Sequence, residues 1–457
     1  MDIINKKIHF VGIGGVGMSG IAKLLLKLGC KVSGSDYKET LSTKKLEELG
    51  AKIYIGHDAA NIQEPEIVVY SSAISPQNPE ILAAQKKGVT LVKRGKMLAD
   101  LMEGKTGIAI SGMHGKTTTT SLVAIVTQEA GLDPTFVIGA DVSQFDGNFR
   151  FGKSELFVAE ADESDGSFLY LEPTYSVITN IELEHMDYYR NINDIIEAYL
   201  NFANKTKKNG CIFWGYDCAN VRKVFDCVNR RGVTFGISQD ADFHPEKIEM
   251  EKFRSSYECV YKNKDLGRIS LQVPGAHNIS NSLAAVAVGM ELGIRFDKIQ
   301  EAIAKFKGAN RRFELKGLVN GIMVVEDYAH HPTEVRATIK AAKNFKDKRI
   351  VVVFQPHRYS RAKYLKQEFG VCFHEADVVI MTDLYSANEA PIEGIDGKVI
   401  YDEVVSQGHK NAHFVPKGEL LEHVVSKLKK DDMLIVMGAG DIGNLSLNVV
   451  NKLGENL

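Results

Sequence analysis

The residues best suited to chemistry stand in the stretch GIAISGMHGKTTTT. Gly112 and Gly115 permit a tight turn, and backbone N–H groups of such a turn and of the helix after it can bind phosphate. Lys116 can reach the outer phosphates of a nucleotide, and the Thr117 hydroxyl can ligate magnesium. Ile110 stands where the strict P-loop pattern has a glycine, so the motif alone leaves a plain glycine turn open. With supporting groups elsewhere, the stretch predicts a nucleoside triphosphate site.

Two polar clusters follow apolar runs that we predict to be neighbouring strands. The run 156–159 leads into four acids, Glu160, Asp162, Glu163 and Asp165. Acids at the carboxyl end of a strand beside a P-loop can hold magnesium, and four carboxylates in a plain solvated turn would repel one another without a cation. The run 175–179 leads into Asn180, Glu182, Glu184, His185 and Asp187. His185 is either a metal ligand or a loop histidine.

A second glycine motif lies near the start of the chain. Gly12, Gly14 and Gly17 are spaced as GxGxxG after an apolar run, and the next predicted strand ends at Asp36. This pattern favours a pyrophosphate on a helix N-terminus, with Asp36 near ribose hydroxyls, over a plain turn. The glycines do not distinguish NAD from a nucleotide sugar. Ser71 and Ser72 follow the fourth predicted strand and would lie at the same sheet edge.

Later segments add polar side chains that suit a nucleotide and an anion. Asn278 and Asn281 lie about a turn apart on a predicted helix and could read an adenine edge, or could be ordinary capping residues. The loops EDYAHHPTE and QPHRYSR bring histidines and arginines to strand ends, where cationic groups usually meet anions. The late Gly438, Gly440 and Gly443 also spell GxGxxG, but no strand ending in an acid follows. We interpret this last motif as a structural turn.

The elements that must position these residues alternate between strand and helix. Predicted strands at 7–11, 31–34, 53, 67–70 and 90–92 form a first α/β unit that ends near Gly104. The segment 240–273 alternates in the manner of antiparallel strands added to a central sheet. Strands at 323–325, 349–354, 378–381 and 433–437 form a last α/β unit, with a boundary near Arg311 and Arg312. The fold class is therefore α/β.

Composition excludes several functions. A chain of 457 residues, 44% hydrophobic and 25% charged, is long enough for about three globular domains. A net charge of -2 gives no reason to expect a nucleic-acid partner, and the apolar run after residue 7 is interrupted by lysines, so we expect no membrane insertion. Six cysteines without CxxC or zinc spacing fit free thiols in a reducing cytoplasm.

The succession of motifs resembles the Mur ligases along the whole chain. The segments are GIGGVGMSGIA, SSAIS, SGMHGKTTTT, EADESDGSF, TNIELEHMD, HNISNSLAA, RRFE, EDYAHHPTE and QPHRYSR. The resemblance implies a Rossmann-like UDP-sugar-binding domain (1–105), a central P-loop ATPase-like domain (106–312) and a Rossmann-like amino-acid-binding domain (313–457). It also implies an ATP-dependent, amide-bond-forming ligase that joins L-alanine to the carboxylate of UDP-N-acetylmuramate for peptidoglycan synthesis, as a monomer or homodimer.

The resemblance assigns roles to individual residues. Expected UDP-sugar contacts are Gly14, Gly15, Gly17, Met18, Ser19, Asp36, Ser71, Ser72 and Arg94. Expected ATP contacts are Gly112, Met113, His114, Gly115, Lys116, Thr117, Thr118, Asn278, Asn281, Arg312 and Asp327. Expected magnesium (Mg2+) ligands are Thr117, Glu160 and His185. The expected catalytic groups are Lys116, Glu160, His185, His331, Arg358 and Arg361, of which the last three match the region that holds the amino acid.

One departure from the family pattern concerns a second metal. Several relatives use a carbamylated lysine on the helix after the His185 motif, whereas this chain has no lysine between Asp187 and Asn204. Either Glu197 substitutes or the second metal is held differently. Two other functions stay open: a family ligase that adds a preformed peptide to the same UDP-sugar, and a nicotinamide-dependent dehydrogenase. The dehydrogenase would leave the ATP loop and both acidic clusters unexplained.

Overall fold

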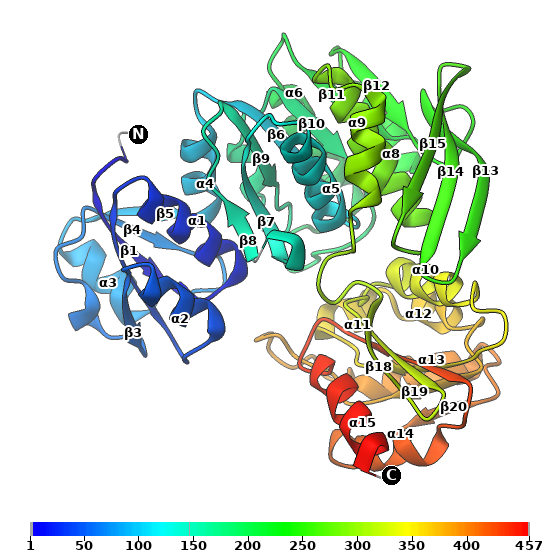
Figure 1. Ribbon diagram of the computed structural model, residues 1–457. Helices are drawn as coiled ribbons and strands as arrows, with labels where there is room; N and C mark the ends of the chain where they lie inside the picture. Colours follow the sequence, from blue (N-terminus) through cyan, green and yellow to red (C-terminus); the bar gives the residue numbers. More distant parts are fainter. Residues whose placement is uncertain (1–2, 146, 456–457) are drawn as a thin grey trace.

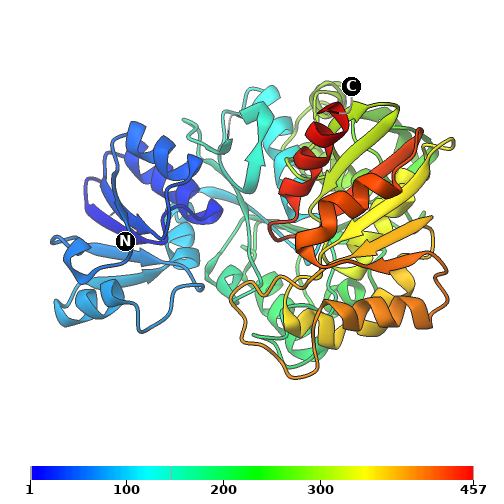
Figure 2. The same cartoon turned by 90° about the horizontal axis from the view of Figure 1, so that it is seen from below.

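The computed structural model describes residues 3–145 and 147–455, and within these ranges the chain forms three domains, each built on its own β-sheet (Figure 1). The N-terminal domain stands to one side, while the central and C-terminal domains pack against each other (Figure 2). The predicted α/β fold with three domains is confirmed.

The N-terminal domain is a parallel sheet with strand order β3-β2-β1-β4-β5 and helices on its faces (Figure 1). Its elements are β1 (Lys7–Val11), α1 (Val16–Lys27), β2 (Lys31–Asp36), α2 (Leu41–Glu48), β3 (Lys52–Ile55), β4 (Ile67–Tyr70), α3 (Pro79–Lys86), β5 (Thr90–Lys93) and α4 (Arg94–Met102). The five strands predicted for this unit are all present. Because β1 lies between β2 and β4, the loops after these three strands meet at one edge.

A buried carboxylate organises the interior of this domain. Glu80 is fully buried and accepts hydrogen bonds from Ser35 (2.5 Å) and Asn61 (2.6 Å), and its Oε2 lies 3.0 Å from His57 Nδ1. His9 Nε2 is 3.6 Å from the other oxygen. Burial alone would raise the pKa of Glu80, but these partners outweigh it and lower the pKa to about 2.

The central domain is a mixed sheet with strand order β15-β14-β13-β12-β11-β10-β6-β9-β7-β8. Its strands are β6 (Thr106–Ser111), β7 (Thr135–Val142), β8 (Gly147–Arg150), β9 (Leu156–Glu160), β10 (Tyr175–Ile178), β11 (Cys211–Gly215), β12 (Gly232–Phe235), β13 (Phe243–Glu251), β14 (Arg254–Tyr261) and β15 (Lys264–Leu271). Its helices are α5 (Lys116–Glu129), α6 (Ile192–Lys205), α7 (Ala219–Phe225), α8 (Ala276–Glu291) and α9 (Phe296–Ala304).

The pairing of this sheet matches the sequence expectation at two points. The antiparallel strands predicted in 240–273 are β13, β14 and β15, which extend the parallel part of the sheet. β6 pairs in parallel with both β9 and β10. The loops after these three strands therefore lie side by side, which is where the glycine loop and the two acidic clusters occur.

The C-terminal domain is a sheet of order β16-β17-β21-β18-β19-β20, parallel except for the edge strand β16. Its strands are β16 (Glu314–Val319), β17 (Ile322–Asp327), β18 (Arg349–Phe354), β19 (Val378–Met381), β20 (Ala412–Phe414) and β21 (Asp432–Met437). Its helices are α10 (Pro332–Ala342), α11 (Tyr359–Tyr364), α12 (Lys366–Cys372), α13 (Gly397–Ser406), α14 (Leu420–Lys427) and α15 (Gly443–Glu455). Apolar clusters cover both faces of this sheet.

The junction between the N-terminal and central domains differs from the junction between the central and C-terminal domains. The N-terminal and central domains share an apolar core, α1 packs on β7 and β8, and Arg94 forms a 2.7 Å ion pair with Asp162. The central and C-terminal domains are connected by the segment between α9 and β16, where Arg311 and Phe313 have φ of +59° and +47°. Such angles are uncommon outside glycine, so this connection is a constrained turn.

The state of the cysteines and the character of the helices can be given for the described residues. All six cysteines lie within the described ranges and are free thiols. Among the helices of the described residues, none combines the length and apolar character that crossing a membrane requires.

Candidate active site

The glycine loop after β6 has a backbone that only glycine suits. Gly112 has φ of +137° and Gly115, which precedes α5, has φ of +81°. A Cβ at Gly112 would collide with Thr179 Oγ1, and one at Gly115 would collide with the Asn281 side chain. The loop therefore brings its N–H groups and the start of α5 to the rim of a cavity, as phosphate binding requires.

Lys116 is already engaged by neighbouring groups. Its Nζ donates to Gly112 O (2.6 Å) and to Glu163 Oε1 (2.7 Å), and Glu163 is fully buried. Tyr189 donates its hydroxyl to the backbone oxygen of Glu163 and so fixes this residue. Burial lowers the pKa of Lys116, but Glu163, Asp162 and Glu160 outweigh it and raise the pKa, which keeps the ammonium charged.

Glu160 and Thr117 lie together beside this lysine. Thr117 donates its hydroxyl to Glu160 Oε2 (3.0 Å), and the same oxygen accepts the Gly139 N–H (2.8 Å). Burial raises the pKa of Glu160, although Lys116 partly offsets the effect. A buried carboxylate with a raised pKa gains from a bound cation. This pair fits the oxygen-rich ligand set that Mg2+ prefers.

The loop after β10 supplies His185 to the same place. His185 Nε2 lies 3.3 Å from Glu163 Oε1, the oxygen that also pairs with Lys116. His185 has φ of +55°, so the backbone holds it in an unusual conformation that points the ring at the acids. The second-metal substitute considered above, Glu197, is exposed on α6 and does not line the described cavities.

A cavity of about 530 Å³ lies between the glycine loop, α8 and the C-terminal domain. Its lining includes these residues expected to contact ATP: His114, Gly115, Thr117, Thr118, Asn278, Asn281, Arg312 and Asp327. Asn278 and Asn281 point the same way, with Asn281 Nδ2 3.4 Å from Asn278 Oδ1. Burial raises the pKa of Asp327 to about 6 against the opposing effect of Arg312. The volume and lining suit a nucleotide.

A smaller cavity of about 280 Å³ joins the N-terminal glycine loop to the central domain. Expected UDP-sugar residues on its wall are Gly15, Gly17, Met18, Ser71, Ser72 and Arg94, which face Glu160 and Asp162. The remaining expected contacts lie behind this wall. Asp36 accepts the Gly14 N–H (2.8 Å), and buried Ser19 donates to Val16 O (3.0 Å). In this structure Asp36 therefore fastens the glycine turn.

The two arginines after β18 reach across to the central domain. Arg361 is buried and donates through Nε to Glu184 (3.0 Å), and its Nη1 lies 2.9 Å from His357 Nδ1. Arg358 pairs with Asp187 (2.8 Å) and stays 29% exposed. The charge of Arg361 holds the pKa of Glu184 well below its usual range despite burial. Arg361 thus ties the two domains together, while Arg358 keeps access to the cavity.

His331 and His114 meet at the same junction. His331 precedes α10 and its ring lies 4.5 Å from that of His114 between centroids. Burial and the neighbouring His114 lower the pKa of His331 to about 4. Burial would also lower the pKa of His114, but the carboxylates of Glu334 and Glu182 outweigh it and raise the pKa to about 9. The junction therefore holds one neutral and one charged imidazole at neutral pH.

A central cavity of about 920 Å³ unites these parts. Val16 contributes from the N-terminal domain, the magnesium-type cluster from the central domain, and Arg358 and Arg361 from the C-terminal domain. Its wall also contains residues to which the sequence assigned no site role, among them Arg311, Glu334, Gly440 and Gly443. Arg311 donates to Gly438 O (2.9 Å) and Gly440 O (3.2 Å), so the late glycine motif is a structural turn that also borders the cavity.

Comparison with known proteins gives this arrangement a family. Three family models match in succession: "Mur ligase family, catalytic domain" at residues 7–106, "Mur ligase middle domain" at 110–289 and "Mur ligase, glutamate ligase domain" at 311–440. The chain belongs to the Mur ligase family. Mur ligases are ATP-dependent, in agreement with the nucleotide-sized cavity beside the glycine loop.

Individual Mur ligases match along the whole chain. The UDP-N-acetylmuramate–L-alanine ligase of Geotalea daltonii is 46% identical over 451 residues, which are 98% of both chains. The structure of the UDP-N-acetylmuramate–alanine ligase of Thermotoga maritima has a TM-score of 0.83 and 31% identity, and covers 99% of this chain and 100% of that one. The murein peptide ligase of Psychrobacter arcticus shares the fold at a TM-score of 0.72 and 22% identity, over 98% and 99% of the two chains.

Proposed function

We propose that this Mur ligase joins L-alanine to the carboxylate of UDP-N-acetylmuramate, with conversion of ATP to ADP and phosphate, in peptidoglycan precursor synthesis. The observation that carries the proposal is the central cavity, because residues of all three domains border it, with Val16 at the start of α1 as the contribution of the N-terminal domain. The alanine-adding relatives match the chain from end to end, which supports the choice of substrates. A single chain builds the whole cavity, so a monomer or a homodimer suffices, and the free thiols suit the cytoplasm.

Each domain binds one substrate, and the three cavities indicate which substrate that is. Residues 1–105 bind the UDP-sugar through the N-terminal glycine loop, and its acceptor carboxylate enters the central cavity beside Glu160 and Asp162. Residues 106–312 bind ATP, with adenine at Asn278 and Asn281 and the phosphates on the glycine loop. Residues 313–457 bring the amino acid through Arg358 and Arg361.

The first chemical step is transfer of a phosphoryl group. A carboxylate is a poor electrophile, so an oxygen of the acceptor attacks the γ-phosphorus, the bond to ADP breaks and an acyl phosphate forms. Lys116 leaves Glu163 and contacts the transferred group, where its fixed positive charge stabilises the developing negative charge. Thr117, Glu160 and His185 would hold Mg2+, which would supply further positive charge to stabilise the phosphoryl transfer.

The second step forms the amide. The amine of alanine attacks the acyl carbon, loses a proton, and the tetrahedral intermediate expels phosphate. Arg358 holds the alanine carboxylate away from the reacting carbon, because a guanidinium can grip a carboxylate with two parallel hydrogen bonds. The Arg361–Glu184 pair keeps the C-terminal domain closed over the site and excludes water, which would otherwise hydrolyse the acyl phosphate.

Substrate-dependent release of ADP tests the proposal. We expect steady release of ADP and phosphate only when UDP-N-acetylmuramate, alanine and magnesium are all present. Glycine, serine and short alanine-containing peptides serve as matched competitors for the amino-acid position. Turnover with a peptide in place of alanine would assign the chain to the peptide-adding ligases, and reduction of a nicotinamide would refute the ligase assignment altogether.

A further inference from the structure

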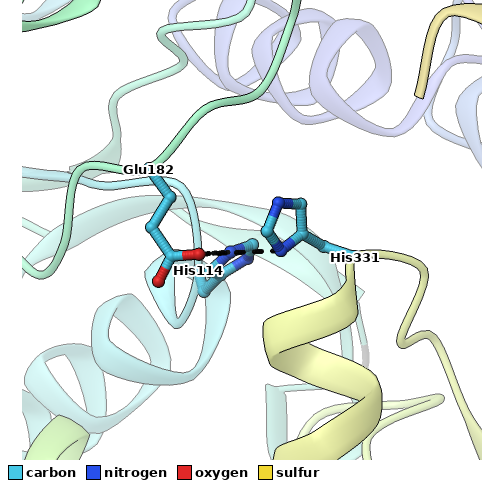
Figure 3. A group of neighbouring side chains, drawn as sticks. All are labelled: His114, Glu182 and His331. Carbon is cyan, nitrogen blue, oxygen red and sulfur yellow. Dashed lines mark ion pairs between the residues drawn. The ribbon is translucent and has the colours of Figure 1, made fainter. Parts of the chain in front are cut away.

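His114, Glu182 and His331 face one another at the junction of the central and C-terminal domains (Figure 3). His114 belongs to the glycine loop, Glu182 to the loop after β10, and His331 to the start of α10. One ligand atom of each side chain lies within 4.8 Å of the other two. The proposed magnesium ligands Thr117, Glu160 and His185 do not belong to this group, so the mechanism above leaves it without a metal role.

The separations are close to those of a metal site. His114 Nε2 lies 3.6 Å from Glu182 Oε2, and His331 Nδ1 lies 3.7 Å from the same oxygen. Ligand atoms about 2.0–2.1 Å from a tetrahedral ion are roughly 3.3 Å apart. Both histidine nitrogens are therefore within a few tenths of an ångström of the spacing that they need to Glu182. The two nitrogens lie within 4.8 Å of each other, so binding one ion would draw the rings together by up to roughly 1.5 Å.

Each histidine has its outer nitrogen held by an oxygen. His114 Nδ1 lies 3.1 Å from Glu334 Oε1, and His114 Nε2 is buried without a hydrogen-bond partner among the described residues. His331 Nε2 lies 3.4 Å from Leu183 O, which leaves the lone pair on Nδ1. That lone pair accepts the N–H of Thr333 in a long contact of 3.3 Å, which a bound ion would replace. An oxygen acceptor behind each ring is the arrangement that orients metal-binding histidines.

The carboxylate is also positioned. Thr333 donates its hydroxyl to Glu182 Oε2 (2.6 Å), which turns that oxygen toward the two rings. His114 and Glu182 line the 530 Å³ cavity, which gives an ion an entry path to the group. Two imidazole nitrogens and one carboxylate oxygen favour zinc-like ions over magnesium, which prefers oxygen ligands.

We propose that His114, Glu182 and His331 form a second metal site, which binds one divalent transition-metal ion of the zinc type. His114 and Glu182 belong to the central domain and His331 to the C-terminal domain, so a bound ion would link α10 to the glycine loop. We therefore expect zinc to stabilise the closed molecule and to slow a turnover that needs the domains to separate.

Direct binding measurements test the site without reference to catalysis. Full-length protein is treated with a chelator, then titrated with Zn2+ by calorimetry and with Co2+ by visible absorption. We expect one ion per chain and the intense absorption of four-coordinate cobalt. His331→Ala and Glu182→Gln should each weaken Zn2+ binding at least about tenfold, since loss of a ligand costs no less than loss of an outer partner.

Two matched variants locate the ion. His185→Ala alters the proposed magnesium site, and His330→Ala removes the histidine next to His331 on the same loop; both should retain Zn2+ affinity. Circular dichroism of each metal-free variant confirms its fold, and the conservative Glu182→Gln keeps the test valid if His331→Ala misfolds. The proposal would be overturned if His185→Ala lost Zn2+ binding while His331→Ala and Glu182→Gln kept it. Weak absorption typical of six-coordinate cobalt in the unmodified protein would also overturn it.

Discussion

Replacement of Arg358 by lysine should raise the KM for alanine at least about tenfold. Arg358 precedes α11 with φ of +70°, and its backbone N–H is anchored to Tyr385 O (2.8 Å). This backbone conformation is strained for a residue other than glycine. It directs the Arg358 guanidinium into the central cavity, toward the acceptor site. The pair with Asp187 holds the guanidinium without burying it completely.

The expected size of the effect follows from the number of hydrogen bonds. A guanidinium makes two parallel, charge-assisted hydrogen bonds to a carboxylate, each worth about 1.5–3 kcal/mol. Lysine keeps the charge but aligns only one of them. Loss of one such bond corresponds to a KM increase of roughly ten- to a hundredfold, since about 1.4 kcal/mol is a factor of ten.

Steady-state kinetics with each substrate varied in turn measure the effect. The KM values for ATP and UDP-N-acetylmuramate should barely change. Arg349→Lys is the matched control: Arg349 makes the same fork to Asp432 (2.8 and 2.7 Å) in the same domain but does not line the central cavity. A raised KM for ATP with an unchanged KM for alanine would place Arg358 in the nucleotide site and refute the reasoning.

Three further outcomes are expected. Lys116→Ala should lower turnover by about two to three orders of magnitude, while calorimetry should show UDP-sugar binding intact; collapse of that affinity would contradict the division of sites. Glu160→Gln and His185→Ala should each shift the magnesium dependence of the rate to higher concentration, and unchanged curves in both would remove them from the metal site. The lowered pKa of Glu80 means that its stabilisation is present above pH 4.5 and lost as pH falls toward about 2. Denaturant unfolding should show a Glu80→Gln deficit on the order of 2–3 kcal/mol at pH 6 that shrinks below pH 4.5, and a pH-independent deficit would disprove the linkage.

Much of the architecture was predictable because local patterns determined it. Apolar runs bounded by glycines marked the parallel strands, and the rule that parallel strands end at one edge correctly grouped the glycine loop with both acidic clusters. Asn278 and Asn281 were placed on one helix face by the helical period alone. The roles given to individual site residues stay predictions until the kinetic measurements are made.

The partners of these residues could not be predicted from one sequence. Glu163 pairs with Lys116 across 47 positions, and Arg361 pairs with Glu184 across 177. Glu334 received no individual role from the sequence, yet it caps the start of α10 and contacts His114 of another domain. Such pairings depend on how domains pack, which no local periodicity encodes.

The bond between Lys116 and Glu163 has a consequence for anions other than the substrate. Glu163 neutralises the positive charge that would otherwise attract inorganic phosphate or sulfate. A bare anion has to break that pair and leave a buried carboxylate uncompensated, which is costly. A nucleotide that binds together with a cation is different, because the cation can neutralise Glu163 and the neighbouring carboxylates when Lys116 turns to the phosphates. We therefore expect the Lys116–Glu163 pair to make the loop discriminate against the abundant small anions of the cell.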